Sequence, residues 1–570
     1  MGKIAVIHCD SSTSEITGAG VEAAVDCIVA RQLRLQKRDC LELFDFTPNE
    51  LEGRMLDCSL YAKLDTCLHA ESKTNKKRFF APLAYHQTLL RISRYLWLKN
   101  CISRFLVETG ATELVLGSSN DADLASACQA VCLTLCIPLE VRDGPAVSPS
   151  NIIHRLGPYG LPKHADPLPL AVIRNTLIQL TQNSGSVLCE PELESNTALR
   201  LKSLRIHNQV SLLNTVARTV RTLWTKTTPE LLTPIAHTAI GEPLHALEWQ
   251  AQFLPDELLV IASALNFFFN HFPTAKLNKL ARNIVGYLQA ASPSMLVLSH
   301  DRADIYRMLA YCAHQCDIPV AYFPHGIIWE DYSGSKTDSL FAPDGMLAWT
   351  SESKENFQSQ GWPALLARFP RYQREAIPYK PFSLDKPSAP RLLYLLPEWV
   401  CATRAGREDC LIHDLMQVID AATEIGLPFQ NLHVKFHSGP PSHLKVKLAS
   451  LERIEKFFGW RLNILPYDTD TFSIIGNYDL ILTSLTSGIF EAILGGVPLV
   501  IVGLGYERIG ALAKHHIPHA NSTKLLVDCL SSYDNADVSR TYRSMVKSLQ
   551  STATIDNCHT EIVRDWHTRG

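Results

Sequence analysis

Hydroxyl and carboxylate side chains follow a predicted strand in the segment DLILTSLTSGIFEAILGGVPLVIV. Ser484, Thr486 and Ser487 form the polar turn, and the apolar residues that follow predict a helix. The start of a helix attracts phosphate through its free N–H groups and its dipole. Glu491 lies one turn into that helix, where it can accept hydrogen bonds from a ribose. The alternative is an ordinary Ser or Thr helix cap without a ligand.

Two cationic side chains stand at the end of another predicted strand, residues 431–436. Lys435 and His437 are two residues apart, so both point to the same face of the strand. Beside a phosphate they would neutralise a departing nucleotide, and Ser438 and Gly439 extend this candidate nucleotide-binding turn. The alternative is that these are surface residues.

A candidate general base follows a third predicted strand. His325 precedes Gly326, which permits a tight turn and close approach of a ligand. Glu330 and Asp331 come shortly after it, and a histidine with a carboxylate in reach can deprotonate a sugar hydroxyl. Asp301 is a rival base at the same predicted edge, and a purely structural loop histidine is the alternative.

Metal-ligating patterns are weak in this sequence. Asp468 and Asp470 form a D-x-D pattern, but they fall in a predicted loop of the second half of the chain. The 16 cysteines include no C-x-x-C pair, and Cys128, Cys132 and Cys136 have the spacing of one helix face, which favours a core role. We therefore expect neither a metal nor a cofactor.

These side chains need parallel sheets to bring them together. Short apolar runs at 3–8, 113–117, 137–141, 295–299, 318–323, 392–396, 431–436, 461–465, 478–483 and 498–502 predict buried strands. Helical segments alternate with them, which predicts α/β domains with ligands at the carboxyl ends of the strands.

Domain boundaries follow from composition. Residues 376–391 contain four prolines and are predicted to be the linker between an N-terminal acceptor domain, 1–375, and a C-terminal donor domain, 392–570. A helical insertion is expected at about 196–290. Its segment 199–226 has a basic face for an anionic acceptor or a membrane surface, or merely a solvated face.

Charge and hydropathy narrow the class of protein. The chain has 54 basic and 57 acidic residues, a near-balance that argues against a nucleic-acid binder driven by bulk charge. It has no signal-peptide pattern and no apolar run of the ~18 residues that a membrane span needs. We expect a cytoplasmic protein that is at most peripheral to the inner membrane face.

With these segments placed, the chain resembles the GT-B glycosyltransferases, in which two Rossmann-like doubly wound domains face a cleft and the C-terminal one binds the donor nucleotide. Residues 479–498 resemble their donor-site signature D-x(3)-T-S…E-A-x(3)-G-x-P. Residues 295–326 resemble the last βαβ unit of their N-terminal domain, and similar units occur in UDP-N-acetylglucosamine 2-epimerases. The useful motifs cover about 295–505.

Within that class, the chain is similar to bacterial surface-polysaccharide enzymes. Sialyl- and Kdo transferases hold CMP through a His-Pro motif and a Ser/Thr pair, which correspond to His437 and the 484–487 turn. The match is imperfect, because Ser438 and Gly439 separate His437 from Pro440. Teichoic-acid-type polyol-phosphate transferases carry a His-Gly motif similar to residues 325–326.

The resemblance implies transfer of a sugar from a CMP- or UDP-linked donor to a glycan or glycolipid acceptor in surface polysaccharide or glycoconjugate synthesis, without a metal. A polyol-phosphate transferase, a UDP-sugar epimerase-like enzyme and a non-catalytic binding protein of the same fold are the alternatives.

Overall fold

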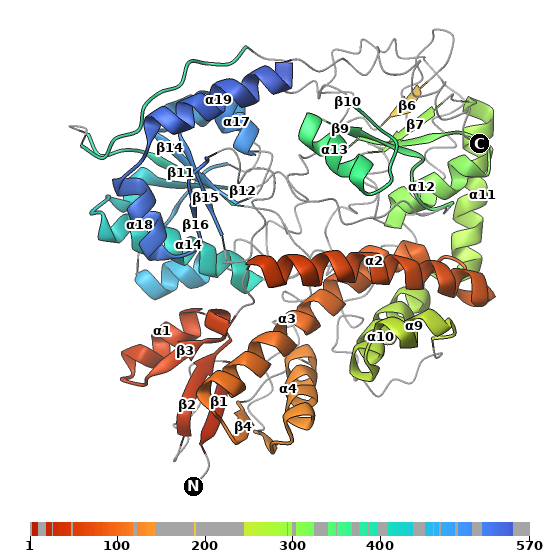
Figure 1. Ribbon diagram of the computed structural model, residues 1–570, viewed down its shortest axis with the longest axis horizontal. Coiled ribbons are helices and arrows are strands. Elements are labelled where there is room, and N and C mark those ends of the chain that lie inside the picture. Colours follow the sequence, from red (N-terminus) through yellow and green to blue (C-terminus); the bar gives the residue numbers. More distant parts are fainter. Residues whose placement is uncertain are drawn as a thin grey trace.

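The computed structural model contains three parallel β-sheets with helices packed around them (Figure 1). The residues that it describes are 3–9, 19–25, 27–46, 50–117, 122–142, 187–189, 244–292, 295–298, 304–323, 340–348, 350–366, 375–385, 388–396, 408–436, 451–459, 461–466, 469–484, 488–503 and 516–550.

The C-terminal sheet, called sheet C, has the strand order of a Rossmann fold, β13-β12-β11-β14-β15-β16. Its strands are β11 (Leu392–Leu396), β12 (Leu432–Phe436), β13 (Asn463–Ile464), β14 (Leu480–Thr483), β15 (Leu499–Val502) and β16 (His519–Ala520). All of them are parallel, and β11 and β14 lie at the centre.

Sheet C is covered on both faces because its central strands are apolar on both sides. Helices α14 (Glu408–Glu424) and α18 (Thr523–Ser531) share one buried cluster with Leu392, Tyr394 and Leu396. Helices α17 (Gly488–Leu494) and α19 (Asn535–Gln550) share another with Leu393 and Leu395. The alternation of side chains along β11 therefore divides two helix layers.

The N-terminal sheet, called sheet A, also has a Rossmann-like order, β3-β2-β1-β4-β5. Its strands are β1 (Ile4–His8), β2 (Ala19–Ala24), β3 (Cys40–Glu42), β4 (Glu113–Leu116) and β5 (Leu139–Val141). Its helices are α1 (Cys27–Leu35), the long α2 (Glu50–Thr74) and α3 (Tyr85–Thr109), and α4 (Ala122–Leu135). Cys128 and Cys132 of α4 are buried in the core, as predicted, whereas Cys136 is exposed.

A third sheet, called sheet B, lies between these two in the sequence and has the simple order β10-β9-β8-β7-β6. Its strands are β6 (Val187–Cys189), β7 (Met295–Leu298), β8 (Val320–Tyr322), β9 (Gly345–Ala348) and β10 (Ala364–Leu366), with α12 (Asp304–His314) and α13 (Ser351–Ser359) between them. The predicted βαβ unit at 295–326 is present as β7, α12 and β8.

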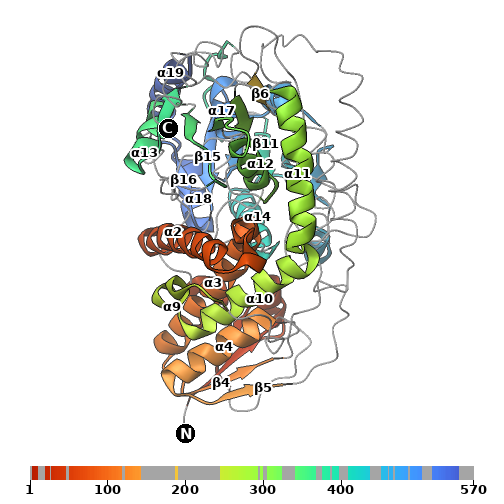
Figure 2. The same ribbon diagram turned by 90° about the vertical axis from the view of Figure 1, so that its right-hand side faces the viewer.

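Helices α9 (Leu247–Gln252), α10 (Pro255–His271) and α11 (Thr274–Ala291) confirm the helical pattern predicted up to residue 290. They share one hydrophobic cluster with sheets A and B, so this part of the predicted insertion belongs to the N-terminal core. Figure 2 shows α11 rising beside α12. The basic segment 199–226 lies outside the described residues.

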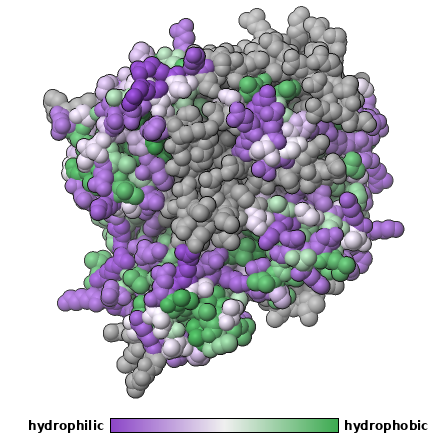
Figure 3. Space-filling view, viewed as in Figure 1, coloured by the Kyte–Doolittle hydropathy of each residue, from purple (hydrophilic) through white to green (hydrophobic). Residues whose placement is uncertain are grey.

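Among the described residues, one bent helix pair has the length and composition of a membrane span. No single described helix has the length and apolarity to cross a bilayer, and residues 255–270 with 274–290 meet that test only together, at a bend of 62°. The face in Figure 3 is mostly hydrophilic, with hydrophobic residues gathered over α3 and α4.

The proline-rich linker is bound to the C-terminal half. Ile377 N donates to Leu494 O and Lys380 N donates to Gly496 O, both at 2.8 Å. Asn535 fixes the next residues, accepting from Tyr379 Oη and exchanging two hydrogen bonds with the Phe382 backbone, each at 2.8 Å.

The α/β class with Rossmann-like sheets is confirmed, while the domain limits 1–375 and 392–570 stay predictions.

Candidate functional site

The strand order of sheet C reverses between β11 and β14. In open parallel sheets the connections on either side of such a point leave in opposite directions, which opens a crevice at the carboxyl ends of the two strands. The polar residues predicted to bind nucleotide follow β12 and β14, and these two strands flank β11. The strand order therefore places the polar residues after β12 and β14 at one edge of sheet C, where both groups can contact the same ligand.

Lys435 is aligned with this edge by strand register. Leu395 of β11 pairs with Lys435 on one side and with Thr483 on the other, so these three side chains share a face of the sheet. Lys435 is 4% exposed, and its Nζ donates to Phe436 O at 3.0 Å. Its buried ammonium places a positive charge close to this edge of the sheet.

Ser484 leaves β14 at the same edge and is fully buried. Its backbone oxygen accepts a hydrogen bond from Thr483 Oγ1 at 3.1 Å, but its own Oγ has no hydrogen-bond partner in the described part of the chain. Most buried hydroxyls are satisfied, so an unsatisfied one at a ligand crevice needs an explanation. A bound polar ligand supplies one.

Glu491 lies in the first turn of α17 and is 5% exposed. All seven residues of α17 are buried, because the helix is wedged between sheet C and α19. So short a helix contributes little dipole at this edge. Thr483 is the threonine of the D-x(3)-T-S signature that residues 479–498 resemble.

Two polar groups near sheet C have structural roles. Asp470 caps α16 (Thr471–Ile474), accepting from Ser473 N at 3.1 Å, so this half of the D-x-D pattern is occupied by helix capping. His433, at the amino end of β12, contacts Tyr478 Oη at 3.0 Å through Nδ1. Burial, together with the charge of Arg391, lowers the pKa of His433.

The remaining predicted site residues lie outside the described residues. In the C-terminal half these are His437, Ser438, Gly439, Thr486 and Ser487. In the N-terminal half these are Asp301, His325, Glu330 and Asp331. The pairing of Leu298 with Tyr322 does show that β7 and β8, which precede Asp301 and His325, end at a common edge of sheet B.

Comparison with known proteins adds a loose likeness at the level of the fold. No family model matches the chain, and no curated protein sequence matches it. Among solved structures, UDP-GlcNAc 2-epimerase from Neisseria meningitidis bound to UDP-GlcNAc is 13% identical over 48% of this chain and 81% of that one, with a TM-score of 0.29.

Two transferases show a similar degree of likeness. A glycosyltransferase from Rickettsia africae is 11% identical over 52% of this chain and 82% of its own, with a TM-score of 0.33. The spinosyn rhamnosyltransferase SpnG is 11% identical over 84% of this chain and 98% of its own, with a TM-score of 0.31. Scores this low carry no functional argument, so the function has to be argued from the site.

Proposed function

We propose that this chain is a GT-B glycosyltransferase that binds a nucleotide-activated sugar at the carboxyl edge of sheet C. The observation that carries the proposal is the alignment of the buried Lys435 with Thr483 across β11, at the edge where Ser484, whose hydroxyl is unsatisfied among the described residues, leaves β14. A buried cation with neighbouring hydroxyls at a Rossmann switch point suits the phosphate of a nucleotide.

The chemistry follows from the change of charge during transfer. As the glycosidic bond to the donor phosphate breaks, negative charge grows on the leaving nucleotide. Lys435 and Ser484 then stabilise the transition state more than the bound donor, which is what accelerates the reaction. His437 and the 484–487 turn are proposed to add donors to the same phosphate.

The other substrate is proposed to be a hydroxyl of a glycan or glycolipid at the cytoplasmic side of a membrane. His325 or Asp301, with Glu330 and Asp331 nearby in sequence, is proposed to deprotonate that hydroxyl. The donor is proposed to be a CMP- or UDP-sugar, and no metal is required in this scheme.

The test is a turnover assay with CMP- and UDP-sugars, with and without a mixture of glycan and glycolipid acceptors. A transferase releases nucleotide faster when an acceptor is present, whereas an epimerase isomerises the sugar without one. Lys435→Met is expected to lower turnover on the order of 100-fold, because a charged contact to the leaving phosphate is lost. Lys524→Met, at an exposed lysine of α18, is the matched control and should retain wild-type turnover.

Acceptor-independent isomerisation would replace the transferase with an epimerase. Absence of any turnover, with unchanged nucleotide binding in Lys435→Met, would contradict the proposed site altogether.

A further inference from the structure

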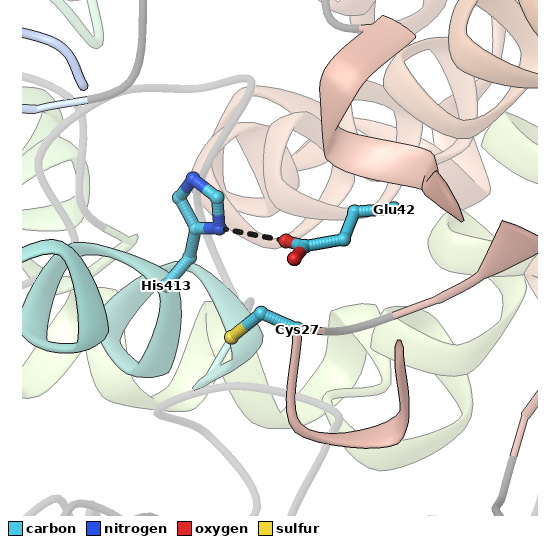
Figure 4. Close-up of side chains that lie close together, drawn as sticks. All are labelled: Cys27, Glu42 and His413. Carbon is cyan, nitrogen blue, oxygen red and sulfur yellow. Dashed lines mark ion pairs between the residues drawn. The ribbon is translucent and has the colours of Figure 1, made fainter. Parts of the chain in front are cut away.

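Cys27, Glu42 and His413 meet where the N-terminal sheet packs against the C-terminal half (Figure 4). One ligand-type atom from each, a thiol sulfur, a carboxylate oxygen and an imidazole nitrogen, lies within 4.8 Å of the other two. Cys27 and Glu42 are buried, and the side chain of His413 is 13% exposed. His413 is far in sequence from the other two residues, so the fold brings it to them.

Each ligand is held by a regular element. Cys27 is the first residue of α1, Glu42 is the last residue of β3, and His413 lies in the second turn of α14. The ring of Phe44 stacks on that of His413, with centroids 4.9 Å apart and planes 8° from parallel. The ring therefore has little freedom to rotate away from the cluster.

The Glu42 carboxylate contacts two partners, one through each oxygen. Arg34 lies 3.3 Å from Glu42 Oε1, while Oε2 lies 3.5 Å from His413 Nδ1. These two contacts hold the Glu42 side chain beside Cys27 and His413. Glu42 Oε2 therefore faces the imidazole of His413.

We propose that Cys27 Sγ, Glu42 Oε2 and His413 Nδ1 bind one Zn²⁺ ion, with water as the fourth ligand. Zinc accepts this mixture of sulfur, nitrogen and oxygen ligands in a tetrahedral arrangement. The thiolate and carboxylate together neutralise the charge of the ion, and binding releases the Cys27 thiol proton to solvent. The start of α1 also favours a negative charge on Cys27.

Gln417 supplies the outer contact that a metal-bound histidine needs. Its Nε2 lies 3.1 Å from His413 Nε2, and its Oε1 is buried without a hydrogen-bond partner in the described part of the chain. When Nδ1 binds the metal, Nε2 carries the proton, and a half-turn of the amide lets Gln417 Oε1 accept it. That turn gives up the 3.3 Å hydrogen bond from Gln417 Nε2 to Asn521 O.

The ion would join the two halves of the chain away from the proposed nucleotide site. α14 covers the face of sheet C opposite to Lys435 and Thr483. Beside the cluster, Arg31 of α1 and Asp420 of α14 already form a two-bond ion pair between the same helices. Zinc would add a bridge between α1, β3 and α14 to this contact.

The experiment is metal binding to the full-length protein after dialysis against a chelator. Zn²⁺ affinity is measured by competition with a chromophoric chelator, and Co²⁺ is added as a spectroscopic probe. We expect a thiolate-to-cobalt charge-transfer band and strong visible bands from tetrahedral coordination. Cys27→Ser should abolish the charge-transfer band, and His413→Ala or Glu42→Gln should weaken Zn²⁺ binding at this site on the order of 100-fold.

Two control variants separate the ligands from their surroundings. Cys40→Ser removes a nearby buried thiol that is not one of the three ligands. Asp420→Asn weakens the same helix contact without touching a ligand. Both should keep the charge-transfer band. A wild-type protein without this band would overturn the zinc site whatever the variants do, and so would a band that persists in both Cys27→Ser and His413→Ala.

Discussion

Ser484 is a fully buried residue whose hydroxyl has no partner in the described part of the chain. A buried hydroxyl that lacks a hydrogen bond lowers the stability of the fold by about 1–3 kcal/mol relative to a satisfied one. A cost of this kind is tolerated at sites where a ligand satisfies the group. The Ser484 hydroxyl should therefore lower the stability of the free protein and strengthen the binding of a nucleotide phosphate.

Ser484→Ala is expected to leave the stability of the free protein unchanged or raise it by up to about 1 kcal/mol, because the unsatisfied group is removed. The same change should weaken nucleotide binding about 5- to 10-fold. Ser263→Ala is the matched control, since Ser263 of α10 is also buried with an unsatisfied Oγ. Thermal unfolding and nucleotide titration check both; a loss of stability with unchanged binding would argue against the assignment.

His314 is a histidine whose two ring nitrogens both face acceptors. Nδ1 lies 2.8 Å from Leu340 O and Nε2 lies 3.1 Å from Asp344 Oδ2. Burial lowers the pKa of His314, but the contact and charge of Asp344 outweigh it, so the pKa is raised. The folded state therefore binds this proton more tightly than the unfolded state does.

The stabilisation from His314 should be complete below the unfolded pKa of about 6.5 and lost as pH rises through the higher folded value. His314→Gln should remove on the order of 1 kcal/mol of this pH-dependent stability. His519→Gln should act in the opposite sense, because burial lowers the pKa of His519 and its contribution is lost as pH falls. Melting temperatures measured from about pH 6 to 8 test this. If the melting temperature changes with pH equally in wild type and His314→Gln, the assigned contact is disproved.

At the scale of elements, the linker is anchored by a glycine turn at the end of α17. Gly496 has φ +65°, and a Cβ there would lie 2.4 Å from Pro378 O and 2.6 Å from Ile377 O. The prolines predicted a linker from sequence. They did not predict that it would lie against sheet C, since the contact depends on Gly496 and Asn535, more than a hundred residues away.

Gly496→Ala is expected to destabilise the C-terminal half by at least about 2 kcal/mol, from backbone strain and from displacement of the linker. Gly426→Ala is the matched control, because Gly426 has φ +69° but nothing within 4 Å of the position that a Cβ would take, so only about 1 kcal/mol of strain applies. Chemical denaturation and limited proteolysis of the linker measure the difference. Equal effects of the two substitutions would contradict the packed linker.

The sequence predicted elements better than it predicted their pairing. Continuous apolar runs identified β11, β12 and β14, because strands buried on both faces carry a strong signal. Strand β6, at 187–189, was not predicted. Lys435 and Ser484 were singled out by residue type, but their shared edge depends on the register through Leu395, and register is a long-range property.

The cluster of Cys27, Glu42 and His413 shows the limit of sequence reasoning more sharply. Its members form no spaced motif, and His413 lies hundreds of residues from the other two, so nothing in the sequence predicts their contact. By contrast, Asp468 and Asp470 form a motif, yet Asp470 is a helix cap. Spacing along the chain is informative only where one element carries all the ligands.

At the scale of the whole molecule, Glu71 joins α2 to the helices at 247–291. It is fully buried, and its Oε2 accepts from the backbone N–H groups of His245 and Ala246 and from Trp249 Nε1, at 2.9–3.1 Å. Its Oε1 accepts from Arg78 at 3.0 Å. The network compensates the buried charges of Glu71 and Arg78, and it holds the residues at the start of α9 in place.

Glu71→Gln should destabilise the protein by about 3–5 kcal/mol, because Arg78 is left as a buried charge without its counter-ion. Glu140→Gln breaks the exposed pair with Arg142 and should cost less than about 1 kcal/mol. Urea denaturation followed by tryptophan fluorescence compares the two variants. A loss below about 1 kcal/mol for Glu71→Gln would show that the network does not hold this region.

Nucleotide binding at the carboxyl edge of sheet C is measured most directly by isothermal titration calorimetry with CMP, CDP, UDP, GDP and ADP. We predict that CMP or UDP binds the wild-type protein and that Lys435→Met weakens this binding about 10- to 100-fold, while Lys524→Met leaves it unchanged. Absence of binding by every nucleotide, or equal affinity in wild type and Lys435→Met, would contradict a nucleotide-sugar site on this sheet.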